Sequence, residues 1–152
     1  MRPAYHALIS IGTGGILLVF LKSWTAAFGC ILSGVFLDID HFFDYFLAKK
    51  GITLSYRELE NYCTYDKTGK LYLFFHSYEF LFLFWICLYF FNLKNAWIGL
   101  AVGASAHILS DQFANPLKPL SYFISYRIQN AFKREKLFTK KHWECVARKE
   151  GP

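Results

Sequence analysis

The sequence predicts an all-α fold: a four-helix transmembrane bundle of two hairpins, followed by a C-terminal interfacial amphipathic helix. Three observations predict it. The composition is very apolar, four apolar stretches have the length of helices, and basic residues collect between and after those stretches. Of the 152 residues, 55% are hydrophobic, 20% are aromatic and only 18% are charged. A soluble domain of this size would have too little polar surface to cover its core, whereas lipid allows apolar side chains to face outward.

The four apolar stretches are read from the distribution of hydrophobic residues along the chain. They run over residues 3–21, 24–48, 71–93 and 95–113. A helix of about 20 residues crosses a bilayer core. The second stretch is apolar only as far as Leu37 and then meets Asp38. Its acidic half must therefore face protein or water.

Short links define the hairpins, and small residues predict how the helices approach one another. Lys22 and Ser23 join the first two stretches, a link around Lys94 joins the last two, and a long loop over residues 49–70 connects the hairpins. Small residues recur four positions apart, a spacing that lets helix backbones come close in lipid. These pairs are Gly29 and Ser33, Gly99 and Gly103, and Ala101 and Ser105.

After the fourth stretch the chain becomes more polar. Residues 120–132 mix aromatics with Arg127 and Gln129, which predicts a helix lying along the membrane interface. We therefore divide the chain into a membrane-embedded metal-site domain over residues 1–132 and a basic, solvated cytoplasmic tail over residues 133–152. The acidic helix end at Asp44 and the tail residue His142 are also expected to be solvated.

Basic residues predict the orientation. Fifteen of the 17 Lys and Arg residues lie before the first stretch, in the central loop or after the fourth stretch, and only Lys22 and Lys94 lie on the opposite side. The positive-inside rule places both termini and the central loop in the cytoplasm. The net charge of +6 does not indicate nucleic acid as a partner, because the basic residues are not interleaved with base-stacking aromatics on a polar domain. The expected partner is membrane lipid.

Ionisable residues inside membrane spans are costly and usually functional. On this topology, each of the four helices brings a histidine or a carboxylate to the cytoplasmic end of the bundle. The residues are His6 on the first helix, Asp38, Asp40 and His41 on the second, His76 and Glu79 on the third, and His107 and Asp111 on the fourth. Their convergence predicts a metal site.

The ligand types and spacings indicate which metal this site would take. His107 and Asp111 are four residues apart and share a helix face, as do Asp38 and His41 at three. Imidazole and carboxylate together suit Zn²⁺, with Mn²⁺ or Fe²⁺ as alternatives. The candidate ligands are His6, Asp38, Asp40, His41, His76, His107 and Asp111, enough for one ion or for a two-metal site that clamps a phosphate. Glu79 is a candidate general base or an acid that orients a histidine, and Asp40 is a second candidate catalytic residue.

Four motifs in order carry a resemblance to a known family. They are the early His6, the block Leu37-Asp38-Ile39-Asp40-His41, the pair His76-Ser77, and Gly103 followed by His107 and Asp111. Over about residues 4 to 115 the chain resembles the membrane-bound, metal-dependent hydrolases of bacterial inner membranes. Leu37 stands where that family usually has proline, and no His-Arg-Gly precedes His76. The His-x-x-x-Asp element is also distantly similar to ligand pairs of zinc-dependent phospholipase C and P1 nuclease.

The resemblance implies a multi-pass protein of the inner membrane that hydrolyses a phosphoester, with a lipid as the expected substrate. Because the family's arginine is missing, Lys70 or Arg127 would substitute in holding the substrate phosphate, and Asn115 is a further candidate for substrate binding. Two alternatives remain open. One is a metal-handling transporter, which would need to form a homo-oligomer because four spans are few. The other is a non-enzymatic membrane scaffold that binds through its basic tail.

Overall fold

In the part of the chain that the structure describes, the protein folds entirely into helices and connecting segments, so the predicted all-α class is confirmed. The structure is a computed structural model that describes residues 3–149, and within that range the only β-pairing consists of two isolated bridges. The chain divides into two compact units. Unit 1 comprises residues 1–38 and 75–115, and unit 2 comprises residues 39–74 and 116–152. The expected boundary after residue 132 falls inside unit 2, and Arg2 of the charge count lies outside the described residues.

Unit 1 contains four α-helices: α1 (Pro3–Leu21), α2 (Trp24–Phe36), α5 (Tyr78–Phe90) and α6 (Ala96–Ala114). Serine hydroxyls begin two of them, because Ser23 accepts the N–H of Ala26 at the start of α2 and Ser77 accepts the N–H of Phe80 at the start of α5. The bounds of α1 are those expected from the sequence. The third stretch is shorter than predicted, since residues 71–77 are not helical and α5 has 13 residues.

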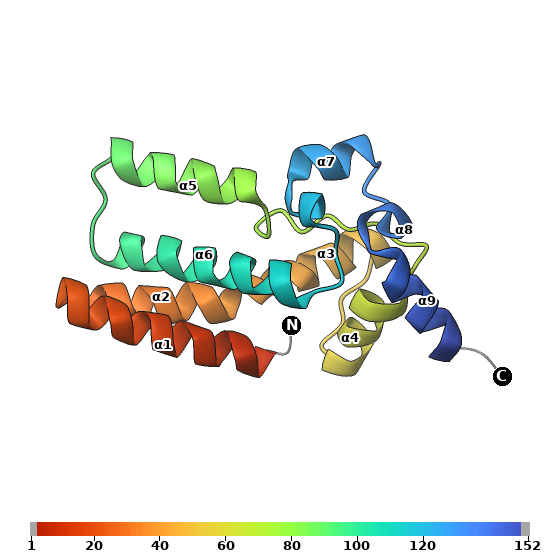
Figure 1. Ribbon diagram of the computed structural model, residues 1–152, viewed down its shortest axis with the longest axis horizontal. Coiled ribbons are helices and arrows are strands. Elements are labelled where there is room, and N and C mark those ends of the chain that lie inside the picture. Colours follow the sequence, from red (N-terminus) through yellow and green to blue (C-terminus); the bar gives the residue numbers. More distant parts are fainter. Residues whose placement is uncertain (1–2, 150–152) are drawn as a thin grey trace. The chain divides into compact units, whose positions relative to one another are not determined.

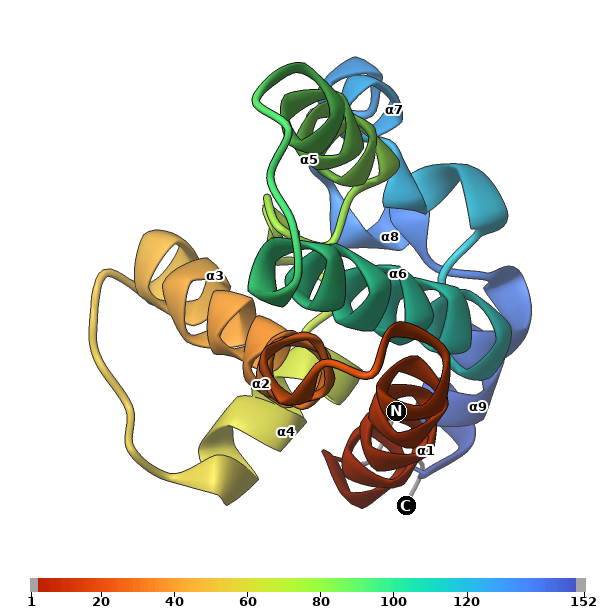
Figure 2. The same cartoon turned by 90° about the vertical axis from the view of Figure 1, so that its left-hand side faces the viewer.

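Within unit 1, α2 packs against both α1 and α6 (Figures 1 and 2). Helices α2 and α6 run in the same direction, and small residues bring their backbones together. Gly29 lies against Ala96, Gly99 against Ala26 and Gly103 against Cys30. A Cβ atom at Gly99 would overlap the carbonyl group of Ala26, so only glycine permits this approach. The close packing brings the C-terminal ends of α2 and α6 together at one end of unit 1.

Among the described residues, two helical segments are long and apolar enough to cross a bilayer: Ala4–Leu21 and Trp24–Lys49. The second is not one regular helix. A 3-10 turn, η1 (Leu37–Ile39), separates α2 from α3 (Asp40–Lys49). The buried core helix of a soluble protein and a signal sequence pass the same test of length and composition. These two segments therefore do not by themselves establish a membrane protein.

Unit 2 contains more regular structure than the sequence predicted. Its helices are α3, α4 (Tyr56–Tyr65), η2 (Pro119–Tyr122), α7 (Ile124–Gln129), α8 (Arg134–Leu137) and α9 (Lys140–Lys149). The predicted interfacial helix over residues 120–132 is wrong as a single element, because η2 ends at Tyr122, Phe123 is extended and α7 ends at Gln129. The expectation of a wholly solvated tail is also wrong, since Leu137 and Val146 are buried.

The core of unit 2 contains charged side chains as well as aromatic ones. Tyr45, Leu59 and Tyr62 form an apolar cluster between α3 and α4. Asp44, expected to be solvated, is only 1% exposed and accepts hydrogen bonds from the Tyr62 hydroxyl and the backbone N–H of Tyr72. Burial of this carboxylate is tolerated because hydrogen bonds replace the water that it loses.

Candidate metal centre

Buried polar side chains gather at the end of unit 1 where α1 and α5 begin and α2 and α6 end. His6 lies in the first turns of α1, Asp38 lies in η1 directly after α2, and His76 lies two residues before α5. His107 and Asp111 lie one turn apart on the last part of α6. The three histidines and Asp111 are at most 2% exposed, whereas the Asp38 side chain is 27% exposed.

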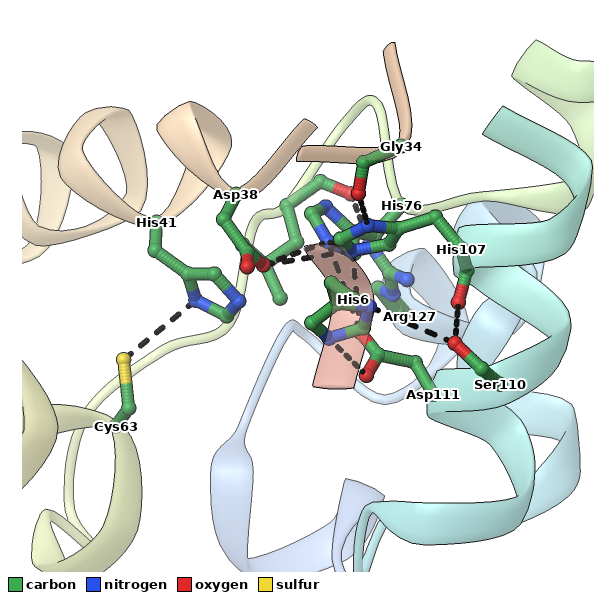
Figure 3. A network of polar contacts seen from close by, with 11 residues as sticks. His6, Gly34, Asp38, His41, Cys63, His76, His107, Ser110, Asp111 and Arg127 are labelled. Carbon is green, nitrogen blue, oxygen red and sulfur yellow. Dashed lines mark hydrogen bonds and ion pairs between the residues drawn. The ribbon is translucent and has the colours of Figure 1, made fainter. Parts of the chain in front are cut away.

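These five side chains face one another (Figure 3). The Nε2 atom of His6 is 3.1 Å from Oδ1 of Asp111. The Nε2 atoms of His76 and His107 are 3.1 Å apart, and they lie 3.6 and 3.4 Å from Oδ1 of Asp38. They lie 3.8 and 3.6 Å from Oδ2 of Asp111. The side chains of Asp38 and Asp111 therefore approach the two imidazoles from different helices.

Backbone contacts set the orientation of His107. Its Nδ1 atom is 2.7 Å from the carbonyl oxygen of Gly34, which can only accept a hydrogen bond, so Nδ1 carries the proton. The lone pair of Nε2 then points into the cluster. This arrangement, in which the far ring nitrogen donates to a carbonyl, is the usual support for a metal-ligating histidine. The ring of His6 stacks on that of His107, with centroids 3.8 Å apart.

Serine side chains lie next to these imidazoles. Ser10 donates to the carbonyl oxygen of His6 at 2.6 Å, and a Cβ atom at Gly34 would overlap its hydroxyl. Ser110 donates to the carbonyl oxygen of His107 at 2.8 Å and lies 3.5 Å from Nδ1 of His6. Ser10, Ser110 and Gly34 were not predicted as site residues from the sequence. The i, i+4 spacing of His6 and Ser10 could have indicated a serine on the same helix face, but no sequence signal identifies the carbonyl of Gly34.

The donor set fits a divalent metal ion. Ligand atoms of His6, Asp38, His107 and Asp111 all lie within 4.8 Å of one another. Ligands about 2.1 Å from a tetrahedral ion are about 3.4 Å from each other, close to most of the separations in this cluster. The Nε2 atom of His6 is buried without a hydrogen-bond partner, although it lies 3.1 Å from Oδ1 of Asp111. A buried nitrogen without a hydrogen-bond partner is costly, and a metal ion would satisfy it.

The remaining predicted ligands and catalytic residues, Asp40, His41 and Glu79, lie on helices α3 and α5. Asp40 and His41 begin α3 and are part of unit 2, where Nδ1 of His41 is 3.5 Å from Sγ of Cys63. Glu79 lies in the first turn of α5, three residues after His76, and is half-buried. The structure of unit 1 therefore brings together five of the seven predicted metal ligands and places one predicted catalytic residue on an adjacent helix.

Of the three predicted substrate-binding residues, Asn115 belongs to unit 1, whereas Lys70 and Arg127 belong to unit 2. Asn115 ends α6, and its backbone N–H donates to the carbonyl oxygen of Asp111 at 2.8 Å. Lys70 is exposed on unit 2. Arg127 is fully buried in unit 2, where it donates to the carbonyl oxygens of Ser121, Tyr72 and Leu73. These hydrogen bonds give Arg127 a structural role in unit 2.

Comparison with known proteins identified no relative of this chain. A scan against models of protein families, a search of curated proteins and a search of solved structures each found no match.

Proposed function

We propose that this protein is an integral membrane, metal-dependent hydrolase of the inner membrane that cleaves a phosphoester of a lipid or of a membrane-associated substrate. The observation that carries the proposal is the cluster of His6, Asp38, His107 and Asp111, whose ligand atoms lie within 4.8 Å of one another. Three histidines and two carboxylates form the mixed donor set that zinc hydrolases use. A bound Zn²⁺, Mn²⁺ or Fe²⁺ would polarise the phosphoryl group and lower the pKa of a water molecule.

The side chains of unit 1 have distinct roles in this proposal. His6, His107 and Asp111 form the buried side of the site, and Gly34 keeps His107 in the tautomer that binds metal. Asp38 is the most exposed ligand, so substrate would reach the site from its side. Glu79, one turn into α5 from His76, is the residue proposed to take a proton from the attacking water. One ion accounts for the compact cluster within unit 1.

Membrane insertion of unit 1 is supported by what its helices expose. Large apolar side chains face outward along α1 and α5: Val19 is 73% exposed, Phe20 80%, Tyr89 83% and Phe90 76%. Such a surface is unfavourable in water and favourable in lipid. We propose that α1, α2, α5 and α6 together form the membrane domain, with both termini and the loop over residues 49–70 on the cytoplasmic side.

The distribution of polar groups favours hydrolysis over transport. In unit 1 the described histidines and carboxylates lie at one end, and a cavity of about 400 Å³ near the start of α2 and α6 has an almost wholly apolar lining that includes Trp24, Phe28 and Leu100. An ion path through the bundle would need polar groups along its whole length. A site at one membrane face instead suits a lipid whose head group reaches the ligands.

Metal analysis of the purified full chain, paired with phosphate-release assays on a panel of phospholipids, tests the proposal. We expect about one ion per chain, bound at least tenfold more weakly after His107→Ala or Asp111→Asn because each variant removes a buried ligand. His142→Ala is the matched control, since it removes a histidine of unit 2 and should leave metal binding unchanged. Stoichiometric metal without any phosphate release would reject hydrolysis, and absence of bound metal would reject the site itself.

A further inference from the structure

The loop between α3 and α4 exposes two aliphatic side chains to solvent. Ile52 is 82% exposed and Leu54 is 94% exposed, the largest exposed fraction among the large hydrophobic residues described. Figure 2 shows this loop extending away from both helices before the chain enters α4. A loop that only had to connect two helices in water would not need two bulky apolar side chains.

Hydrogen bonds hold this loop in place. Thr53, between the two aliphatic residues, is only 7% exposed; its hydroxyl donates to Oε2 of Glu58 at 2.7 Å and accepts the backbone N–H of Ser55 at 3.1 Å. The Tyr45 hydroxyl donates to Oε1 of the same glutamate. The hydrogen bond from Tyr45, and after it the one from Thr53, hold the pKa of Glu58 below its ordinary value. Because neighbours in an extended segment point to opposite sides, burial of Thr53 turns Ile52 and Leu54 outward.

The apolar surface continues onto α3. Phe42 and Phe46, and likewise Phe43 and Leu47, are four residues apart and so lie on the same face of this helix. Each of these four residues is between 42% and 55% exposed. The opposite side of α3 is occupied, since Tyr45 packs with Leu59 and Tyr62 of α4. We call the exposed apolar residues of α3 and of the loop that follows it in the chain the α3–loop surface.

Basic residues border the α3–loop surface. Lys50, in the left-handed conformation that ends α3, and Arg57, in the first turn of α4, are both exposed. The surrounding unit is also strongly basic, because unit 2 contains 14 of the 17 Lys and Arg residues but only 8 of the 11 Asp and Glu residues. The net charge of +6 therefore belongs entirely to unit 2. Exposed apolar side chains with Lys50 and Arg57 next to them in the chain match the chemistry of an anionic lipid interface.

We propose that the α3–loop surface docks unit 2 onto the head-group region of an anionic bilayer, with Ile52 and Leu54 inserted among the acyl chains. Lys50 and Arg57 pair with lipid phosphates at the edge of the contact. This docking rests on the proposed membrane insertion of unit 1 but not on the proposed hydrolase activity, and it would hold even if unit 1 bound no metal.

Fluorescence of the full chain reconstituted into nanodiscs tests this docking. An environment-sensitive fluorophore is attached at Leu54→Cys, in a chain whose four native cysteines are replaced by serine or alanine. Glu60→Cys, an exposed position on α4 of the same unit, is the matched control. The discs contain phosphatidylcholine alone or mixed with phosphatidylglycerol, and each mixture is also prepared with nitroxide-labelled lipid.

In anionic discs we expect a blue-shifted emission at position 54, quenching by the nitroxide lipid and protection from aqueous iodide, with none of these changes at position 60. The shift should decrease in phosphatidylcholine alone and after Lys50→Glu with Arg57→Glu. Equal iodide quenching at the two positions would overturn the proposal. Protection from iodide without quenching by nitroxide lipid would also overturn it, because the surface would then be covered by protein, such as a second copy of this chain.

Discussion

The two units of this protein differ in how many charged residues they contain and in what their buried charged residues contact. Unit 1 has three basic and three acidic residues and exposes large apolar side chains, whereas unit 2 has fourteen basic and eight acidic residues. Unit 1 buries histidines and carboxylates against one another at one end. Unit 2 instead buries arginines against backbone carbonyl groups.

Their cores are stabilised by different contacts. In unit 1, glycine and alanine let the backbones of α2 and α6 touch, so close packing stabilises this pair of helices. In unit 2, Arg134 donates to the carbonyl oxygens of Tyr62 and Cys63 and stacks on the ring of Tyr62. Close backbone packing is suited to lipid, where side chains gain little by turning inward, and the arginine network is suited to an aqueous interface. The two units therefore differ in what stabilises them: close helix packing in unit 1 and buried arginine hydrogen bonds in unit 2.

The largest expected effect comes from Gly99 in unit 1. Gly99→Leu should prevent α2 and α6 from packing and cost more than about 3 kcal/mol, because the new side chain overlaps the backbone of Ala26. Thermal unfolding in detergent measures the loss. Gly15→Ala is the control, since a Cβ atom there meets nothing within 4 Å and alanine should stabilise α1 by about 0.5–1 kcal/mol. Equal stability of the two variants would reject the role of close backbone packing.

In unit 2 the largest effect should come from a buried arginine. Arg127→Met removes hydrogen bonds to three carbonyl oxygens and should cost about 2–3 kcal/mol, because these oxygens are left unsatisfied. Hydrogen exchange should increase in unit 2 while α1 and α2 keep their protection. The exposed Arg148→Met should change stability by less than about 0.5 kcal/mol. A loss of protection confined to unit 1 would contradict this assignment.

Metal binding should raise the stability of unit 1 and leave that of unit 2 unchanged. Zn²⁺ at about 100 times its dissociation constant should stabilise unit 1 by about 2.7 kcal/mol and protect the amides of α1 and α6, and a chelator should reverse both effects. Exchange in α4 and α9 serves as the internal control and should not respond. Asp38→Asn should weaken the response, because this carboxylate is one of the four grouped ligands. Equal protection of both units would indicate nonspecific binding.

The smallest expected effect concerns pH and unit 2. His142 was expected to be solvated, but burial, as the largest cause, lowers its pKa. The Nε2 atom of His142 lies 2.9 Å from the carbonyl oxygen of Thr64. A histidine whose pKa is lower in the folded state stabilises the fold above its unfolded pKa of about 6.5, and this contribution is lost as the pH falls. Unfolding of α9 by acid should therefore shift to lower pH in His142→Gln. An unchanged acid transition would show that His142 does not contribute.

The parts of the fold that could be predicted depend on local patterns. The bounds of α1 follow from an unbroken apolar run that ends at Lys22, and a close approach of helix backbones follows from small residues spaced four apart. That α2 makes this approach to α6 was decided by the tertiary structure. Helices α4 and α9 were not predicted, because short polar helices depend on tertiary partners for most of their stability. The choice of His6, His76, His107 and Asp111 as candidate ligands was possible because ionisable residues stand out in apolar sequence.

By itself the sequence determined that the protein is helical, and its alternation of apolar runs indicated which His and Asp residues would gather at the ends of helices. The tertiary structure alone decided that Asp38 joins the cluster of unit 1 while Asp40 and His41 belong to unit 2. It also decided that Arg127 is a core residue. The reason is physical: periodicity places a residue on a face of its own helix, but whether a charged side chain is buried depends on partners supplied by distant segments. For Arg127 these partners include the carbonyl groups of Tyr72 and Leu73, more than 50 residues away in the chain.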